Sequence, residues 1–285
     1  MKIIDTHVHV WDLEKAAYPW LEGDRSILNR TWRIEEIKED RKKAEVTAGV
    51  LVQASGNLED TELMLETARR TDWICGVVVW LPLMDPETTQ QLLEERFLNE
   101  KYFKGVRHQI HDEKDPGWLL RPEVAESLKI LSSYGIPYDV VGIKPDHIET
   151  VLTVAEKIPD LKMVFDHLNW PPIPTKERFG KWGELMTIAA KNKNLYAKIS
   201  GLGTASGNFQ NRNADDIKPY VEFVLQQFST DRCFCGADWP VSMLANNYVQ
   251  TWQITKDILS SLLNEREKDK VLFFNANKFY NLGLN

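Results

Sequence analysis

Eight short runs of β-branched and other apolar residues recur along this chain of 285 residues, and a helix-like stretch follows each of them. Runs of this length and composition are typical of buried strands. Eight strand–helix units in succession are what an α/β fold of the (β/α)8 TIM-barrel type requires. The predicted strands are Lys2–Val10, Thr47–Ala54, Ile74–Leu81, Phe103–Ile110, Ile136–Val141, Lys162–Leu168, Leu195–Ser200 and Arg232–Ala237.

Helix start signals support the same alternation. Asp85-Pro86 is typical of an N-cap followed by proline in the first turn, and Pro122 has the same role. A doubly wound open sheet is the alternative, but no Gly-x-Gly-x-x-Gly follows the first run. The predicted helices are Ile34–Val46, Thr61–Arg70, Glu87–Asn99, Pro122–Ser133, His147–Lys157, Arg178–Ala190, Ile217–Phe228 and Tyr248–Leu263, with Glu265–Leu282 as one more helix packed on the outside.

The length suits one barrel, because folds of this type commonly fill about 250 residues as a single unit. No linker or low-complexity segment divides the sequence, so we expect one domain over residues 1–285. A net charge of −7 argues against a nucleic-acid partner, and no apolar run is long enough for a membrane span. Three cysteines suit a reducing compartment. We therefore expect a cytoplasmic protein, and a homodimer stays open.

The active sites of such barrels lie at the carboxyl ends of the strands, so the polar residues there are the candidates. The first run ends with His7 and His9. Since side chains alternate along a strand, Asp5, His7 and His9 are expected on one face, with Asp5 supporting the site from below. Two imidazoles at a strand end can bind a metal or act together on one substrate carbonyl.

Other strand ends add further polar residues. Side-chain alternation allows only one of Arg107 and His108 to face the barrel axis. If His108 faces inward, Arg107 reaches over the rim. In the sixth run, His167 is expected to face inward and Asp166 to point towards the helices. The remaining candidates are Gln53 in the second run, Lys198 in the seventh and Asp238 after the eighth.

Together these motifs resemble the amidohydrolase superfamily. The resemblance rests on Ile-Asp-Thr-His-Val-His at 4–9, Phe-Asp-His at 165–167 and Gly-Ala-Asp-Trp-Pro at 236–240. It is closest to the amidohydrolase-related branch, which includes sugar lactonases such as L-fuconolactonase and L-rhamnonolactonase. Further similar segments are residues 18–20, 105–108 and 198–202. The resemblance implies a hydrolytic barrel, metal-assisted or metal-free, with Asp238 as the base.

The same resemblance bears on the cofactor. Members with two metals bridge them through a modified lysine or a glutamate on the fourth strand, where this chain has Arg107 and His108. The fifth run ends without a histidine. We therefore expect at most one divalent ion, zinc being favoured, bound by His7, His9 and Asp238. A metal-independent enzyme is the alternative, and the role of His111 stays open.

Lactone hydrolysis needs a base to activate water, a group that stabilises the oxyanion and an acid for the leaving alkoxide. Asp238 is expected to be the base and, once protonated, to return its proton to the ring oxygen. His7, His9 and His108 are expected to polarise the carbonyl, directly or through the metal.

Aromatic residues indicate the substrate class. Trp11, Trp20, Trp118, Trp170 and Trp239 fall in predicted strand-to-helix segments, where flat faces suit a sugar. The predicted substrate-binding residues are Arg107, His167, Gln53, Trp20, Trp239 and Lys198. Lys198 is alternatively the ion-pair partner of an interior carboxylate such as Asp5.

Few arginines at the strand ends favour a neutral aldonolactone over a multiply anionic lactone. The leading hypothesis is therefore a lactonase, a hydrolase that acts on a cyclic ester. A metal-dependent non-oxidative decarboxylase is the second enzyme hypothesis. A catalytically inactive sugar-binding barrel is the third, and the intact His7, His9 and Asp238 count against it.

Overall fold

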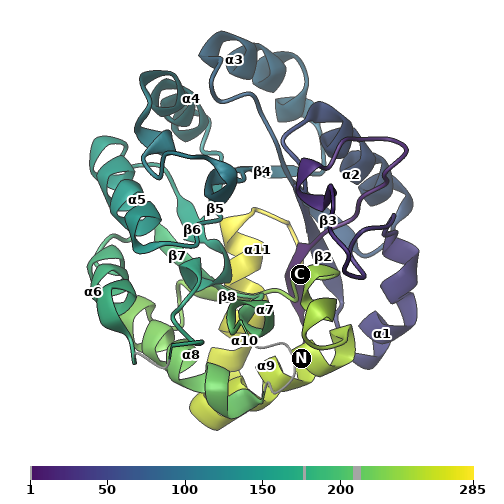
Figure 1. Ribbon diagram of the computed structural model, residues 1–285, viewed down its shortest axis with the longest axis vertical. Coiled ribbons are helices and arrows are strands. Elements are labelled where there is room, and N and C mark those ends of the chain that lie inside the picture. Colours follow the sequence, from purple (N-terminus) through teal and green to yellow (C-terminus); the bar gives the residue numbers. More distant parts are fainter. Residues whose placement is uncertain (1, 176–177, 208–212) are drawn as a thin grey trace.

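The computed structural model describes residues 2–175, 178–207 and 213–285, and within these ranges eight strands form one sheet. Each strand pairs in parallel with the next along the chain. Helices surround the strands (Figure 1), so the protein is the predicted (β/α)8 barrel. Every strand lies inside the run predicted for it: β1 Ile4–Val8, β2 Ala48–Val52, β3 Ile74–Val79, β4 Phe103–His108, β5 Tyr138–Val140, β6 Met163–Phe165, β7 Leu195–Ile199 and β8 Cys233–Cys235.

The ring closes between β1 and the residues that follow β8. Val8 and Trp239 form an isolated parallel bridge, in which the backbone nitrogen of His9 donates to the carbonyl of Trp239 (2.7 Å). The backbone nitrogen of Asp238 donates to the carbonyl of His7 (2.8 Å). Gly236 permits this approach, because a Cβ at that position would lie 2.6 Å from the Cβ of His7. The first and last strands are thus neighbours.

Each stretch predicted to be helical contains helix. The Asp85 side chain accepts a hydrogen bond from the backbone nitrogen of Thr88, and proline follows the cap as predicted. The helices are α1 Lys38–Lys43, α2 Leu58–Arg70, α3 Pro86–Glu95, α4 Pro122–Ser133, α5 Pro145–Lys157, α6 Gly180–Ala189, α7 Leu202–Ala205, α8 Ala214–Phe228, α9 Tyr248–Leu262, α10 Glu265–Asp269 and α11 Asn275–Phe279, with a π-helical turn at Lys270–Phe274. Short 3₁₀ turns cover Pro19–Leu21, Ile34–Ile37, Phe97–Asn99, Ile110–Asp112, Trp118–Leu120, Asp166–Asn169 and Val241–Leu244.

The end of the chain closes the floor of the barrel, so the prediction of one outer helix over Glu265–Leu282 is wrong for α11, whereas α10 has no buried residue. In Figure 1, α11 (yellow) lies within the outline of the strand ring, not among the outer helices. Phe279, its last residue, and Tyr280, which follows it, form one buried cluster with interior strand residues. The strand members of this cluster include Ile4, Val50, Val78, Val164 and Phe234. An apolar helix face shows that a helix packs, but not against which surface.

A register irregularity in β1 changes which side chains share a face. The pairing with β2 shifts between Asp5 and Val8. Asp5 therefore points towards α9, where it accepts hydrogen bonds from the Tyr248 hydroxyl (2.8 Å) and the Trp252 indole (3.3 Å). His7 points into the barrel. The expectation that Asp5 shares a face with His7 is wrong, because the irregularity interrupts the alternation of side chains.

Two further observations concern the chain as a whole. Over the described ranges, no helix combines the length and the apolar character needed to cross a bilayer. Cys75, Cys233 and Cys235 are free thiols, and burial raises the pKa of the Cys75 thiol to about 11. Cys233 and Cys235 are buried in β8. Cys233 and Cys235 therefore pack in the protein interior, and Cys75 is partly buried in β3.

Candidate active site

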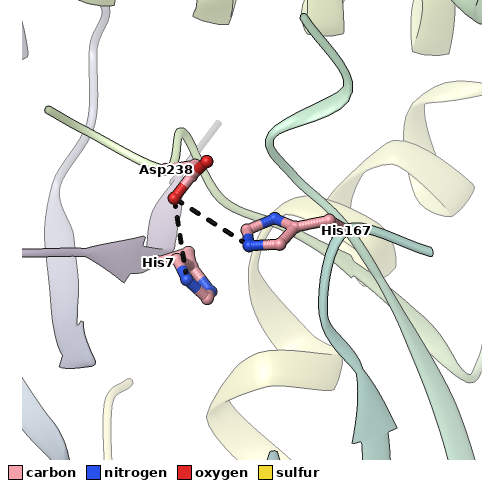
Figure 2. A group of neighbouring side chains, drawn as sticks. All are labelled: His7, His167 and Asp238. Atoms are coloured by element: carbon pink, nitrogen blue, oxygen red, sulfur yellow. Dashed lines mark ion pairs between the residues drawn. The ribbon is translucent and has the colours of Figure 1, made fainter. Parts of the chain in front are cut away.

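The carboxyl ends of β1, β6 and β8 bring two imidazoles and a carboxylate together (Figure 2). Asp238 Oδ1 lies 3.8 Å from Nε2 of His7 and 3.9 Å from Nε2 of His167. His9 adds a third imidazole, with Nε2 3.4 Å from the same oxygen. All four side chains are buried. One carboxylate oxygen therefore faces three ring nitrogens at the top of the barrel.

A left-handed turn after β6 carries two residues into the site. The four residues from His167 to Trp170 have φ angles between 52° and 58°. Such a conformation costs about 1–3 kcal/mol for a non-glycine residue and persists where the surroundings hold it. Here the Trp182 indole donates to the carbonyl of Leu168 (2.8 Å). The turn lets both His167 and the adjacent Asp166 enter the barrel, so the expectation that Asp166 points towards the helices is wrong.

Ser200 and Gly201, at the end of β7, hold the ring of His167. The Ser200 hydroxyl lies 2.9 Å from Nδ1 of His167 and accepts a hydrogen bond from its backbone nitrogen (3.3 Å). Gly201 has a φ of 58°, and a Cβ there would lie 2.5 Å from Nδ1 of His167 and 2.8 Å from Oδ2 of Asp238. The glycine therefore leaves the space in which this imidazole and this carboxylate face each other.

A cavity of about 260 Å³ opens above the group. Asp238, His9, His167 and Arg107 line its polar part, whereas His7 is fully buried beneath it. Its other described lining residues are Trp11, Trp20, Ala54, Gln109, His111, Val141, Ile143, Trp170 and Val241. The cavity is thus mostly apolar and aromatic, with a small polar floor, as sites for small molecules commonly are.

Of Arg107 and His108, it is Arg107 whose side chain faces the barrel axis. Its guanidinium enters the barrel, where Nε donates to Gln53 Oε1 (3.1 Å) and Nη1 lies 3.3 Å from Nε2 of His7. His108 instead stacks on Trp118, with ring centroids 4.0 Å apart. This orientation takes His108 out of the candidate catalytic group, because adjacent residues of a regular strand face opposite ways.

His108 has a complete set of partners outside the cavity. The Trp80 indole donates to its Nδ1 (3.1 Å), and its Nε2 lies 2.8 Å from Glu113 Oε1. Burial lowers its pKa, against the opposing effect of Glu113. Both ring nitrogens are occupied by the chain itself, so the residue has a structural role.

Below the cavity lies a set of buried charges, of which the sequence had indicated only an ion pair of Lys198. Lys198 Nζ lies 2.6 Å from Asp139 Oδ2 and 2.7 Å from Asp166 Oδ1. Asp166 Oδ2 in turn lies 3.1 Å from Arg107 Nη1. Of the two alternatives for Lys198, the ion-pair partner is therefore correct, but its carboxylates are Asp139 and Asp166, not Asp5. As a predicted substrate contact Lys198 is wrong, because it is fully buried beneath the site.

Burial and these charges shift the pKa values in the site. Burial raises the pKa of the Asp238 carboxyl to about 6, against the opposing effects of His167 and Arg107. Burial also lowers the pKa of His9 to about 3 and that of His7 well below its usual value. Although burial alone would raise it, Lys198 and neighbouring groups hold the pKa of Asp166 well below its usual range. At neutral pH the histidines are therefore neutral and the carboxylates are ionised.

The donor set fits one divalent ion. His9 Nδ1 donates to the carbonyl of Val52 (2.7 Å), which leaves the lone pair on Nε2 facing Asp238. Two acceptors this close need a proton, a water or a cation between them, and imidazole with carboxylate is a set that zinc takes. Within the described chain, the three groups that meet the spacing of a metal site are His7, His167 and Asp238. This group shares His7 and Asp238 with the predicted set and adds His167, while His9 Nε2, 3.4 Å from Asp238 Oδ1, lies beside it.

Two other predicted substrate contacts lie away from the cavity. Gln53 is fully buried and its carbonyl and side chain both accept hydrogen bonds from Arg107. Trp239 is 2% exposed and packs against Trp32, with ring centroids 5.4 Å apart. Neither is among the described residues that line the cavity. Gln53 therefore positions Arg107, and Trp239 packs the loop after β8.

Some lining residues had no assigned role in the sequence. His111 lines the cavity, with Nδ1 3.3 Å from the carbonyl of Val141. Gln109 lies beside it and accepts a hydrogen bond from Gln53 (3.1 Å). Both follow β4, so their position just after a strand end was the available signal. Trp118 stacks on His108 and is not among the described lining residues, whereas Trp11, Trp20 and Trp170 are.

The amidohydrolase family matches residues 4–282 of the chain. An L-fucono-1,5-lactonase of Burkholderia ambifaria is 27% identical over 86% of this chain and 82% of its own length. An L-rhamnono-gamma-lactonase of Scheffersomyces stipitis is 23% identical over 99% of both chains. Among solved structures, an amidohydrolase of Burkholderia multivorans with bound zinc superimposes with a TM-score of 0.89, at 25% identity and 99% coverage of each chain.

Proposed function

The chain belongs to the amidohydrolase family, and we propose that it is a lactonase that opens a sugar-acid lactone, with Asp238 as the base that activates water. The observation that carries this proposal is the buried Asp238 carboxylate on the floor of the cavity, where Arg107 and His167 also lie. Base and oxyanion stabiliser therefore meet at one place. Relatives that are L-fucono-1,5- and L-rhamnono-gamma-lactonases support the reaction class.

Asp238 suits the role of base for two reasons. Its pKa of about 6 leaves it ionised at neutral pH yet basic enough to accept a proton. The described charges of the site are two cations, Arg107 and Lys198, and three carboxylates. Two of the carboxylates, Asp139 and Asp166, form ion pairs with these cations. The negative charge of Asp238 is left for water or a bound ion. After taking a proton, Asp238 returns it to the ring oxygen.

Arg107 suits the role of oxyanion stabiliser. Two hydrogen bonds to Gln53 and the ion pair with Asp166 fix its guanidinium while it still lines the cavity. A donor fixed before the reaction stabilises the charge that develops on the carbonyl oxygen. A divalent ion held by His7, His167 and Asp238, with His9 beside them, would supply Lewis-acid polarisation at the same place when bound.

The cavity walls suit a neutral sugar lactone. Trp11, Trp20 and Trp170 offer aromatic surface, and Trp20 is fixed by a hydrogen bond from its indole to the carbonyl of Ala54 (2.8 Å). Arg107 is the one lysine or arginine among the described lining residues. A multiply anionic substrate would need more cations than this cavity offers.

The test is a panel of 1,4- and 1,5-aldonolactones, with proton release measured for chelator-treated and zinc-supplemented enzyme. We expect turnover of at least one lactone, and a fall in kcat of about 10²–10⁴-fold for Asp238→Asn. Asp85→Asn is the matched control, because asparagine caps α3 as well as aspartate does. Turnover by Asp238→Asn at the wild-type rate contradicts the base. Carbon dioxide release from a carboxylic-acid substrate, with no lactone of the panel opened, points to the decarboxylase, and sugar binding without turnover to an inactive barrel.

A further inference from the structure

A continuous chain of buried polar contacts runs through the barrel from its floor to the candidate active site. The Tyr280 hydroxyl donates to Asp139 Oδ2 (2.6 Å), which also contacts Lys198 Nζ (2.6 Å). Lys198 contacts Asp166, and Asp166 contacts Arg107. We call these five residues, Tyr280, Asp139, Lys198, Asp166 and Arg107, the axial ladder. None of them is more than 4% exposed.

The upper end of the ladder holds His7 from both sides. Lys198 Nζ lies 3.2 Å from Nδ1 of His7, and Arg107 Nη1 lies 3.3 Å from Nε2 of the same ring. Nε2 of His7 also faces Asp238 Oδ1 at 3.8 Å. A neutral imidazole accepts at one nitrogen only, so one of the two cations donates to the ring, and displacing that cation moves or rotates an imidazole directly under the proposed base.

The lower end of the ladder comes from the C-terminal segment. Tyr280 follows α11 and its ring packs on Phe234, with centroids 5.7 Å apart. Phe273 and Phe279 already supply the apolar contacts of this segment. A phenylalanine at position 280 would fill the same space, so the hydroxyl serves the contact with Asp139. A buried hydroxyl without a partner is destabilising, so the hydrogen bond to Asp139 is required to accommodate the Tyr280 hydroxyl in the barrel floor.

The hydroxyl affects how Lys198 is shared. Asp139 Oδ2 receives donors from both Tyr280 and Lys198, and Lys198 divides its contacts between Asp139 and Asp166. Without the hydroxyl, Asp139 would have less stabilisation of its negative charge and would attract the ammonium more strongly. Lys198 would then move towards the floor, away from Asp166 and His7.

We propose that Tyr280 is a positioning residue for the active site, acting through Asp139 and Lys198 on His7 and Arg107. Its effect on catalysis rests on the lactonase function proposed above, whereas its effect on the His7 ring does not. The C-terminal segment thus contributes to the geometry of a site at the opposite end of the barrel.

The test compares Tyr280→Phe with Tyr220→Phe. The control also loses a tyrosine hydroxyl bond, from Tyr220 to the carbonyl of Pro172 (3.0 Å), on the outer helix α8. We expect kcat to fall about tenfold in Tyr280→Phe with KM within about twofold, because the site is misaligned and not removed. The control should keep both constants, and thermal unfolding should show both variants folded.

Two further measurements separate this proposal from the proposed function. ¹⁵N resonances of the His7 ring should shift in Tyr280→Phe and stay in place in Tyr220→Phe, whether or not a lactone is turned over. In an Asp139→Asn background, Tyr280→Phe should add little, since both act on the same contact. Unchanged His7 resonances in folded Tyr280→Phe, or fully additive effects in the double variant, overturn the proposal.

Discussion

Nε2 of His9 lies 3.4 Å from Oδ1 of Asp238, and the other ring nitrogen of His9 donates to a backbone carbonyl. The imidazole therefore presents a lone pair, not a proton, to the carboxylate. Burial disfavours the charged forms of both groups. This pairing makes the site receptive to a proton or a cation.

The activity should depend on the ionisation of Asp238. A base works only when deprotonated, so kcat/KM should be constant at neutral pH and fall as the pH drops below about 6, the pKa of Asp238. Initial rates with a good lactone, measured across the acid pH range, give the pKa at which kcat/KM falls. A pKa near 3.8, the value of an unperturbed aspartate, would show that burial does not set the pKa of the base.

Zinc should stabilise the folded protein through the imidazoles that face Asp238. A ligand that binds the native state raises Tm, and the rise grows with its concentration. We expect a zinc-dependent rise in Tm for the wild type and a much smaller one for His167→Ala. His108→Phe is the control, since His108 lies outside the cavity group. Equal zinc responses in wild type and His167→Ala would remove His167 from the ligand set.

Gly201→Ala should abolish activity because its Cβ would collide with both His167 and Asp238. Gly135 provides the matched control, since it also has a positive φ (68°) but no atom within 4 Å of an added Cβ. Both alanines should lose about 1–2 kcal/mol of stability from the left-handed backbone, and Gly201→Ala should lose more because its Cβ also collides with two side chains. Only Gly201→Ala should also lose kcat. Wild-type turnover by Gly201→Ala would contradict the close packing around His167.

His108→Phe should reduce stability without reducing turnover. The phenyl ring keeps the stack on Trp118 but loses the contacts with Trp80 and Glu113. Both partners are only partly buried and can turn to water, so the loss should be that of ordinary hydrogen bonds, about 0.5–1.5 kcal/mol each. Chemical denaturation measures the stability, and kcat should stay within about twofold. A hundredfold fall in kcat in the folded variant would return His108 to the catalytic group.

The sequence predicted the fold more completely than the direction in which individual side chains point. Each strand was predicted because β-branched residues cluster in short runs. Such a cluster can be recognised even when the predicted strand boundaries are off by one or two residues. The direction of a side chain can be predicted only where side chains alternate without interruption along the strand. The irregularity in β1 turns Asp5 outward, and the left-handed turn after β6 brings Asp166 inward. Neither feature leaves a pattern in the residue types.

The axial ladder was missed although a signal was present. Asp139 stands between Tyr138 and Val140 in a fully buried strand, and Lys198 stands between apolar residues in β7. Two opposite charges embedded in buried strands of one barrel indicate an interior ion pair, because an isolated charge there would be strongly unfavourable. What the sequence could not show is Tyr280, which reaches the pair from 141 residues away.

The left-handed turn has a consequence for anyone who wishes to alter substrate preference. His167 and Trp170 stand at its two ends and both border the cavity. A replacement that relaxes the backbone at Trp170 will tilt His167 as well, so selectivity and turnover cannot be tuned separately there. Mutant libraries should instead vary Trp20 or His111, whose backbones are independent of that bend.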